Sequence, residues 1–531
     1  MLFIRTEDIT PDKVKSYYIE MDQDRKIIDS LKSQTPCVLV GGRGIGKSFL
    51  LRITEQELLE DFEDKRTLPV YITFRASPLI STKNENQFYY WMLSRISSEI
   101  IRQFRKKGLI NNSTPSLKKF LGQEDSLSTT KIEQLCELFE NSYKYPNQLI
   151  DTSDIPSIDD FINVLEDVCL DSNVERIVLL IDEAAHVFIP EQQRQFFTLI
   201  RDLRVSFITV NAAVYPGITV YGDTFQPTHD ATFINLNRSI NDEDYINNMK
   251  EMVFKQADST LTNKLLNRGE SFTILAYASG GNPRHLLKTI EKISNSKIDG
   301  NVVNEIIREY YRNDIWSEHS LLSEKYSGLS RVIDWARTFI EETVIPDLKK
   351  RNESALHKND KTTSYLWIDR NAPQLVKEAL RILEYTGIIT EASKGIKATR
   401  GKIGNRYCLN VGCLFSADNA PSNTGLNIVN NLSIKKMLEY GMNSKKFEDV
   451  PDVDSFYDLS EVLNTLLSKP ITHLDLTQWQ KDKLHEVEIY TIGQVLEASE
   501  EKLMEAYYVA ETRSRQMKNS AIAAVYEYLV G

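Results

Sequence analysis

Residues 41–48 read GGRGIGKS and complete the phosphate-binding pattern GxxxxGK[ST]. Glycines let the N–H groups of such a loop approach phosphate oxygens, and a lysine ammonium group can reach the β- and γ-phosphates. Lys47 is that lysine, and the Ser48 hydroxyl is the expected ligand of Mg²⁺ beside it. The pattern predicts that ATP and Mg²⁺ bind to this segment, through Gly41, Gly42, Arg43, Gly44, Ile45, Gly46, Lys47, Ser48 and Phe49.

A pair of carboxylates, Asp182 and Glu183, follows the apolar run 177–181. The C-terminal end of a parallel strand lies at the sheet edge where such folds bind their ligands. We expect Asp182 to hold Mg²⁺ through a water molecule, and Glu183 to act as the general base that polarises the attacking water. Together with Lys47, this pair predicts an enzyme that hydrolyses ATP to ADP and phosphate.

These motifs require a sheet that brings them together. The loop lies between an apolar run and a stretch with helical periodicity, which is the order of a strand, a loop and a helix. Short apolar runs of this kind are typical of a buried parallel sheet, so the predicted fold class is α/β. We expect a helical insertion at about 78–172, and five strands at 37–40, 69–74, 177–181, 206–210 and 232–236.

A second helical region, 240–310, contains the sequence SGGNPRHL. Gly280 and Gly281 can end one helix, Asn282 can cap the next, and Pro283 suits the first helical position. This arrangement fixes Arg284 on the first turn of the second helix.

Together, GGRGIGKS, VLLIDE, TVN and GNPR resemble the motifs of AAA+ P-loop ATPases of the origin-recognition/initiator (ORC/Cdc) type. The resemblance implies that Asn211, after the strand 206–210, is the polar sensor-1 residue. It implies that Arg284 is the sensor-2 arginine that contacts the γ-phosphate in a lid domain. It further implies an arginine finger supplied to a neighbouring subunit, for which Arg201 and Arg204 are candidates.

The region from about 315 to 416 has the pattern of a winged helix, with a helix at 373–386 followed by two strand-like pieces and a basic loop. Lys377 and Arg381 are expected on one exposed side of that helix. The net charge of the chain is −11, so a local run of cations without an acid indicates phosphate contact. The expected DNA contacts are Lys377, Arg381, Lys394, Lys397, Arg400, Lys402 and Arg406.

The C-terminal region resembles the C-terminal domain of the RNA polymerase alpha subunit and other helix-hairpin-helix modules, through LDLTQWQKDKLHEVEIYTIGQVLEASEEKL and VAETRSRQMKNSA. Ala510 stands where such hairpins usually carry glycine, so both DNA binding and protein docking remain open for this domain. The expected domains are the ATPase core 1–238, a lid 239–312, a winged helix 313–416, a linker 417–454 and a helical domain 455–531.

The remaining composition excludes several classes of function. The five cysteines and seven histidines show no zinc-ligand spacing, and no apolar run approaches the roughly 20 residues of a membrane span. The start of the chain lacks a signal-peptide pattern. We therefore expect a cytoplasmic protein without a membrane partner.

The resemblance implies a slowly hydrolysing, ATP-controlled switch that assembles on double-stranded DNA. Self-association or a partner protein would complete its ATP site. One alternative is a signal-transducing P-loop ATPase, for example in antiphage defence, whose C-terminal modules bind proteins. A further alternative is a loader or transposition regulator.

Overall fold

The computed structural model describes residues 2–530 except 77–85, 111–130, 145–149, 153–154, 185–189, 223, 295–297, 326–328 and 452–465. The expected boundary between a linker and a helical domain at 454/455 lies outside the described residues, as does the expected start of the insertion at 78. The chain forms two compact units, Phe3–Asn237 and Arg238–Gly531, the second joined by the first two residues. Among the described residues, no helix is both long and apolar enough to span a bilayer.

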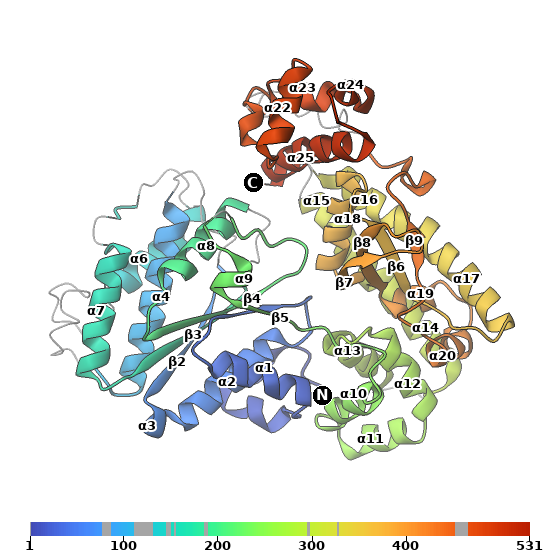
Figure 1. The fold of residues 1–531 in the computed structure, drawn as a ribbon. Coiled ribbons are helices and arrows are strands. Elements are labelled where there is room, and N and C mark those ends of the chain that lie inside the picture. The colour runs from blue at the N-terminus through green and yellow to red at the C-terminus, as the bar shows by residue number, and fades with distance from the viewer. Residues whose placement is uncertain are drawn as a thin grey trace. The chain divides into compact units, whose positions relative to one another are not determined.

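The first unit is built on a five-stranded sheet in the order β2-β3-β4-β1-β5 (Figure 1). All of its neighbouring strands are parallel. This arrangement confirms the predicted α/β class. The strands are β1 (Cys37–Val40), β2 (Thr67–Thr73), β3 (Arg176–Asp182), β4 (Ile208–Val214) and β5 (Thr232–Asn235).

Helices cover both faces of this sheet (Figure 1). One face packs against α1 (Asp22–Lys32) and α2 (Lys47–Glu60), and shares a core with Val178 and Leu180 of β3. The alternate side chains of β3, such as Leu179, belong to the core on the opposite face. That core includes side chains of α4 (Gln87–Lys106), α6 (Lys131–Glu140), α7 (Ile158–Asp171) and α8 (Pro190–Asp202). The strands are buried on both faces, which explains their nearly continuous apolar runs.

Strand β2 is an edge strand of the described sheet. The N–H of Phe74 donates to the carbonyl of Asp182 and the carbonyl of Arg66 accepts from the N–H of Glu175, so the even-numbered residues of this segment face β3. Pro69 therefore lies at a position whose backbone faces away from the sheet. Proline is tolerated there because its missing N–H costs no ladder hydrogen bond.

The second unit begins with a bundle of helices that carries the GNPR sequence. Its members are α10 (Tyr245–Phe254), α11 (Ser259–Leu266), α12 (Gly269–Ala278), α13 (Pro283–Ser294) and α14 (Gly300–Glu309). Gly281 has φ of 82°, and a Cβ atom there would lie 2.4 Å from the carbonyl oxygen of Arg238. This turn between α12 and α13 therefore requires glycine.

A four-stranded sheet in the order β7-β8-β6-β9 follows in the same unit. It contains β6 (Tyr365–Asp369), β7 (Ile389–Lys397), β8 (Ile403–Leu409) and β9 (Leu438–Tyr440), with α18 (Gln374–Tyr385) between β6 and β7. β7 and β8 form the antiparallel hairpin that the basic loop closes. The preceding helical segments are α15 (Trp316–Lys325), α16 (Ser330–Thr338), a π-helical turn (Phe339–Val344) and α17 (Ile345–His357).

The segment 417–454, which the sequence predicts to be a linker, is part of the folded second unit over its described residues 417–451. It contains α20 (Pro421–Asn430), which packs against α19 (Val411–Ser416), and it contains β9. β9 pairs in parallel with β6, and Lys436 forms an ion pair with Asp360 at 2.9 Å. Polar composition misled the prediction because the backbone of this segment completes a sheet that starts some 70 residues earlier.

The C-terminal helices are α22 (Gln478–Glu486), α23 (Ile492–Glu497), α24 (Glu500–Met504) and α25 (Glu511–Val530). Thr477 and Gln480 form a capping box at α22, and Thr491 and Gln494 form one at α23. The turn between α24 and α25 places Tyr508, with φ of 65°, in the left-handed conformation. Ala510, the residue expected at the hairpin glycine, does not have a positive φ, so its backbone does not require glycine.

Candidate functional site

The phosphate-binding loop lies between the end of β1 and the start of α2. Gly46 has φ of 109° and precedes Lys47, the first residue of α2. The left-handed backbone at Gly46 lets the chain enter the helix directly from the loop. The positive end of the α2 dipole is thereby directed at the loop, which favours an anion.

The side chain of Lys47 folds back over this loop. Its ammonium Nζ lies 2.5 Å from the carbonyl oxygen of Gly41 and 2.9 Å from that of Gly42. The same atom lies 4.2 Å from the ring centroid of Tyr215, which follows β4. Lys47 is 7% exposed, so its charge is held at the loop rather than in bulk water.

Asp182 ends β3 with both carboxylate oxygens engaged. The hydroxyl of Tyr71 donates to Oδ2 at 2.7 Å, and the backbone N–H of Glu183 donates to Oδ1 at 2.9 Å. The guanidinium carbon of Arg52 lies 3.3 Å from the centroid of the Tyr71 ring. These contacts fix the orientation of a buried carboxylate, as a metal-holding side chain requires.

The lysine loop and the acidic pair lie at the same edge of the sheet. Val40 of β1 pairs with Val214 of β4, and Ile181 of β3 pairs with Ala212 of β4. Beyond these pairs, the N–H of Gly41 donates to the carbonyl of Val214, and the N–H of Ala184 donates to that of Ala213. One strand therefore separates the two motifs, and Tyr215 leaves that strand between them.

The Glu183 carboxylate differs from its neighbour in environment. Burial and the adjacent charge of Asp182 raise its pKa above the ordinary value. Its Oε2 lies 3.5 Å from the Thr73 hydroxyl and 3.6 Å from Nε of Arg75. Glu183 also adopts φ of 56°, a conformation that costs energy for a residue with a side chain and is found at functional sites. A carboxylate with a raised pKa accepts a proton more readily, which suits a general base.

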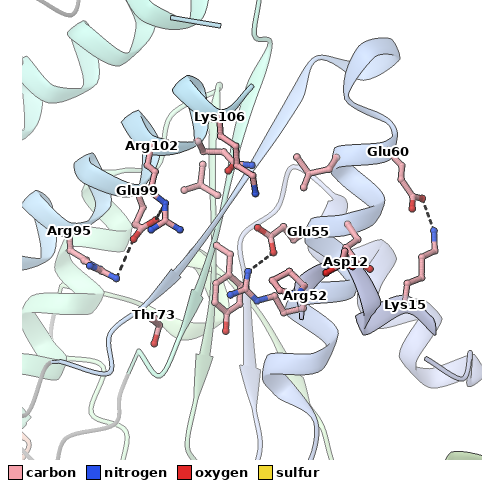
Figure 2. A pocket seen from close by; sticks show the side chains of 16 residues that line it. Asp12, Lys15, Arg52, Glu55, Glu60, Thr73, Arg95, Glu99, Arg102 and Lys106 are labelled. Atoms are coloured by element: carbon pink, nitrogen blue, oxygen red, sulfur yellow. Dashed lines mark hydrogen bonds and ion pairs between the residues drawn. The ribbon is translucent and has the colours of Figure 1, made fainter. Parts of the chain in front are cut away.

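A pocket of about 570 Å³ lies next to this site, along β2 and between α2 and α4 (Figure 2). Arg52 reaches it from α2, and Arg95 from α4. Arg52 pairs with Glu55 at 2.7 Å, and Arg95 pairs with Glu99 at 3.2 Å. Because both arginines are already paired with carboxylates, we assign the pocket no ligand.

The sequence shares a family pattern over most of its length. The family model described as ORC-CDC6-like matches residues 3–366, which is more than half of the chain. The chain belongs to the ORC-CDC6-like family. It is therefore an AAA+ ATPase of the origin-recognition type, as the motifs predicted.

Two solved structures show a more distant likeness to this ORC-CDC6-like protein. One is a Walker-type ATPase of Pyrococcus abyssi, with 13% identity, a TM-score of 0.38, and coverage of 78% of this chain and 97% of that one. The other is the Aeropyrum pernix ORC1 protein in complex with DNA, with 11% identity, a TM-score of 0.33, and coverage of 79% and 95%. No curated protein matches the chain.

The expected placement of the sensor-1 residue in this ORC-CDC6-like ATPase is wrong. Asn211 lies within β4, opposite Leu180, and is fully buried. Its Oδ1 accepts from the N–H of Cys37 at 3.0 Å, and its Nδ2 donates to the carbonyl of Leu31 at 2.9 Å. Asn211 therefore joins β4 to α1 and the start of β1, away from the edge that carries Lys47. The residue at that edge is Tyr215, which could have been found by continuing the apolar run through NAAV.

Replacing Asn211 with alanine should lower stability rather than remove catalysis. The change leaves a buried N–H and a buried carbonyl without their partner, at a cost of about 1–3 kcal/mol each. We expect a lower denaturation midpoint of the first unit and an unchanged turnover per folded molecule, measured by urea titration and ATPase assay. A loss of turnover at unchanged stability would restore a catalytic role for Asn211.

The arginines proposed for nucleotide contact lie in different settings. Arg284 is on the first turn of α13, in the second unit, and its backbone N–H donates to Oδ1 of Asn282 at 3.0 Å. Its Nε is buried without a hydrogen-bond partner among the described residues. Arg201 pairs with Asp202 at 3.1 Å, and Arg204 pairs with Asp230 at 3.3 Å. Both are about half exposed, so a neighbouring molecule could reach them.

The winged-helix cations separate into two groups. Lys397, Arg400 and Lys402 are exposed at the β7–β8 hairpin and form no ion pair among the residues that the structure describes. Lys394 is exposed but pairs with Glu391 at 3.4 Å, and the Arg406 side chain is partly buried.

Lys377 and Arg381 are not exposed together on α18 as predicted. Burial lowers the pKa of Lys377, and the nearby positive charge of Arg515 lowers it further. Arg381 pairs with the buried carboxylate of Glu378 at 2.8 Å. The helix α25 packs against α18, and this contact could not be read from the periodicity of α18 alone.

Proposed function

We propose that this chain is an Mg²⁺-dependent ATPase that works as a slow switch rather than for metabolic turnover. The observation that carries the proposal is the placement of Lys47 and the acidic pair at one sheet edge, on either side of the end of β4. The proposed nucleotide site comprises residues 41–49. The sensor-2 role of Arg284 stays a prediction.

The residues at this edge fit Mg²⁺ without a dedicated protein cage. The Ser48 hydroxyl and the Asp182 carboxylate provide oxygen ligands, which Mg²⁺ prefers in combination with substrate phosphates. No cluster of three or more acidic, histidine or cysteine side chains suited to a metal occurs in the described parts of the chain. When bound, the metal would neutralise charge on the phosphates.

The protein residues would divide the remaining work. Loop N–H groups and the Lys47 ammonium would hold the triphosphate, and Glu183 would take a proton from the attacking water. Tyr71 would keep the Asp182 carboxylate oriented through its hydrogen bond. Completion of the site by a second copy or a partner protein, through Arg201 or Arg204, is part of this proposal.

We further propose that the protein binds double-stranded DNA in the cytoplasm through the β7–β8 hairpin. Replacing Lys397, Arg400 and Lys402 together with alanine should lower the affinity for duplex DNA about tenfold or more. The slope of log affinity against log salt should become shallower by about 0.9 for each phosphate that the variant no longer neutralises. Fluorescence anisotropy over a salt series measures both quantities.

A matched control removes three exposed cations from α17 and the turn after it, namely Lys350, Arg351 and Lys358. This control has the same net charge as the hairpin variant. It should nevertheless bind DNA as tightly as the unaltered chain does. Equal affinity for the hairpin variant and the unaltered chain would remove the DNA proposal. ATP turnover that responds to a protein ligand but not to duplex DNA would then favour a signal-transducing ATPase. The packing of α25 against α18 is compatible with this alternative, because it limits access of DNA to α18.

A further inference from the structure

The start of α18 is bonded to the last helix of the chain. The backbone N–H of Gln374 donates to Oδ1 of Asn519 at 2.9 Å, and Nδ2 of Asn519 donates to the carbonyl of Ala372 at 3.0 Å. Nε2 of Gln516 donates to Oδ1 of Asn371 at 3.4 Å. Asn519 is 6% exposed, so this amide is committed to the contact.

Three charged side chains of α18 also lie near α25. Lys377 is partly buried, with Arg515 of α25 near it. Arg381 pairs with Glu378, whose side chain is 2% exposed, and the buried Tyr526 of α25 lies near both charges. In a winged helix that binds DNA, the helix before the wing enters the major groove with its N-terminal residues against the bases. In this chain, the N-terminal end of α18 is bonded to α25 instead.

A second contact holds the start of α25. The Asn443 side chain, from the loop after β9, hydrogen-bonds to Glu511 and to Arg515. The bonds at both places are made by polar side chains, which is typical of domain contacts that separate and re-form. The C-terminal helices have their own buried side chains, including Leu484, Val495 and Met517, so separation does not require them to unfold.

We propose that the C-terminal helical domain is a reversible cover on α18, which must leave before this helix can enter a DNA groove. With the cover docked, DNA contact is limited to the exposed cations of the hairpin. With the cover displaced, Lys377 and the start of α18 become a second DNA-binding surface. This inference rests on the proposed DNA binding.

The test uses the full chain with Gln516→Ala and Asn519→Ala, which removes the hydrogen bonds to residues 371–374. We expect duplex DNA affinity to rise roughly tenfold, and the salt dependence to become steeper by about 0.9 for each further phosphate that the protein neutralises. Lys377→Gln should change DNA affinity little in the unaltered chain and lower it several-fold in the double variant. Amide hydrogen exchange at Gln374 should become faster in the double variant.

Ser520→Ala is the control on the same helix, because the Ser520 hydroxyl bonds to the carbonyl of Asp475 within the C-terminal domain. It should leave DNA affinity unchanged. If the double variant binds no more tightly and Lys377→Gln has the same effect in both backgrounds, the cover does not exist, although binding through the hairpin would still stand. If neither the unaltered chain nor the double variant binds DNA, the proposed function fails and the cover proposal fails with it.

Discussion

Replacing Lys47 with alanine should lower the affinity for ATP on the order of 100-fold, because hydrogen bonds from a charged donor are worth about 1.5–3 kcal/mol and Lys47 would make more than one. The ammonium group is buried at the loop, within reach of the Gly41 and Gly42 carbonyls. No other lysine lies within residues 41–49 to replace it. Titration with a fluorescent ATP analogue, followed by competition with ATP, measures the change.

Lys65→Ala provides the matched control, because Lys65 is an exposed lysine whose ion pair with Asp61 lies at the far end of α2. This variant should bind ATP like the unaltered chain. An affinity within twofold of normal for Lys47→Ala, in a protein that remains folded, would show that the loop does not hold the triphosphate as proposed.

Replacing Glu183 with glutamine should slow hydrolysis by about 10²–10⁴-fold while ATP binding stays within a few-fold. The amide keeps the size of the side chain but cannot accept a proton from water. Single-turnover measurements with radiolabelled ATP separate the chemical step from binding and product release.

The unaltered enzyme should also lose activity as pH falls, at a higher pH than an ordinary glutamate would cause. Burial and Asp182 raise the pKa of Glu183, so the carboxylate is protonated, and inactive as a base, at a pH where an exposed glutamate is still ionised. The residual rate of Glu183→Gln should lack this decline. Glu191→Gln, a change of an exposed acid on α8, should alter neither rate nor pH profile, and normal hydrolysis by Glu183→Gln would assign the base elsewhere.

The parts of the site that sequence could predict are those with local signals. A glycine loop followed by Lys47 and an acidic pair after an apolar run depend on neighbours within about ten residues, and the structure places both at one edge of the sheet. The sequence pattern predicts Asn211 after the strand because a polar residue usually ends an apolar run. In the fold, the strand continues because α1 and β1 supply partners for the buried amide.

The winged-helix prediction shows the same limit. The amphipathic pattern located α18 to within one residue at each end. The exposure of its cations, however, is decided by Asn519 and its helix, 145 positions later in the chain. The apolar periodicity of α18 and α25 does not show that these two distant helices contact each other.

Pro69 restricts how copies of this protein can associate. Its ring removes a hydrogen-bond donor from the outer side of the edge strand, so another chain cannot extend the sheet by regular strand addition at β2. An association of copies at this margin of the five-stranded sheet would therefore have to use side-chain contacts rather than a continuous ladder of backbone hydrogen bonds. Pro69 therefore opposes aggregation of copies by strand addition at β2.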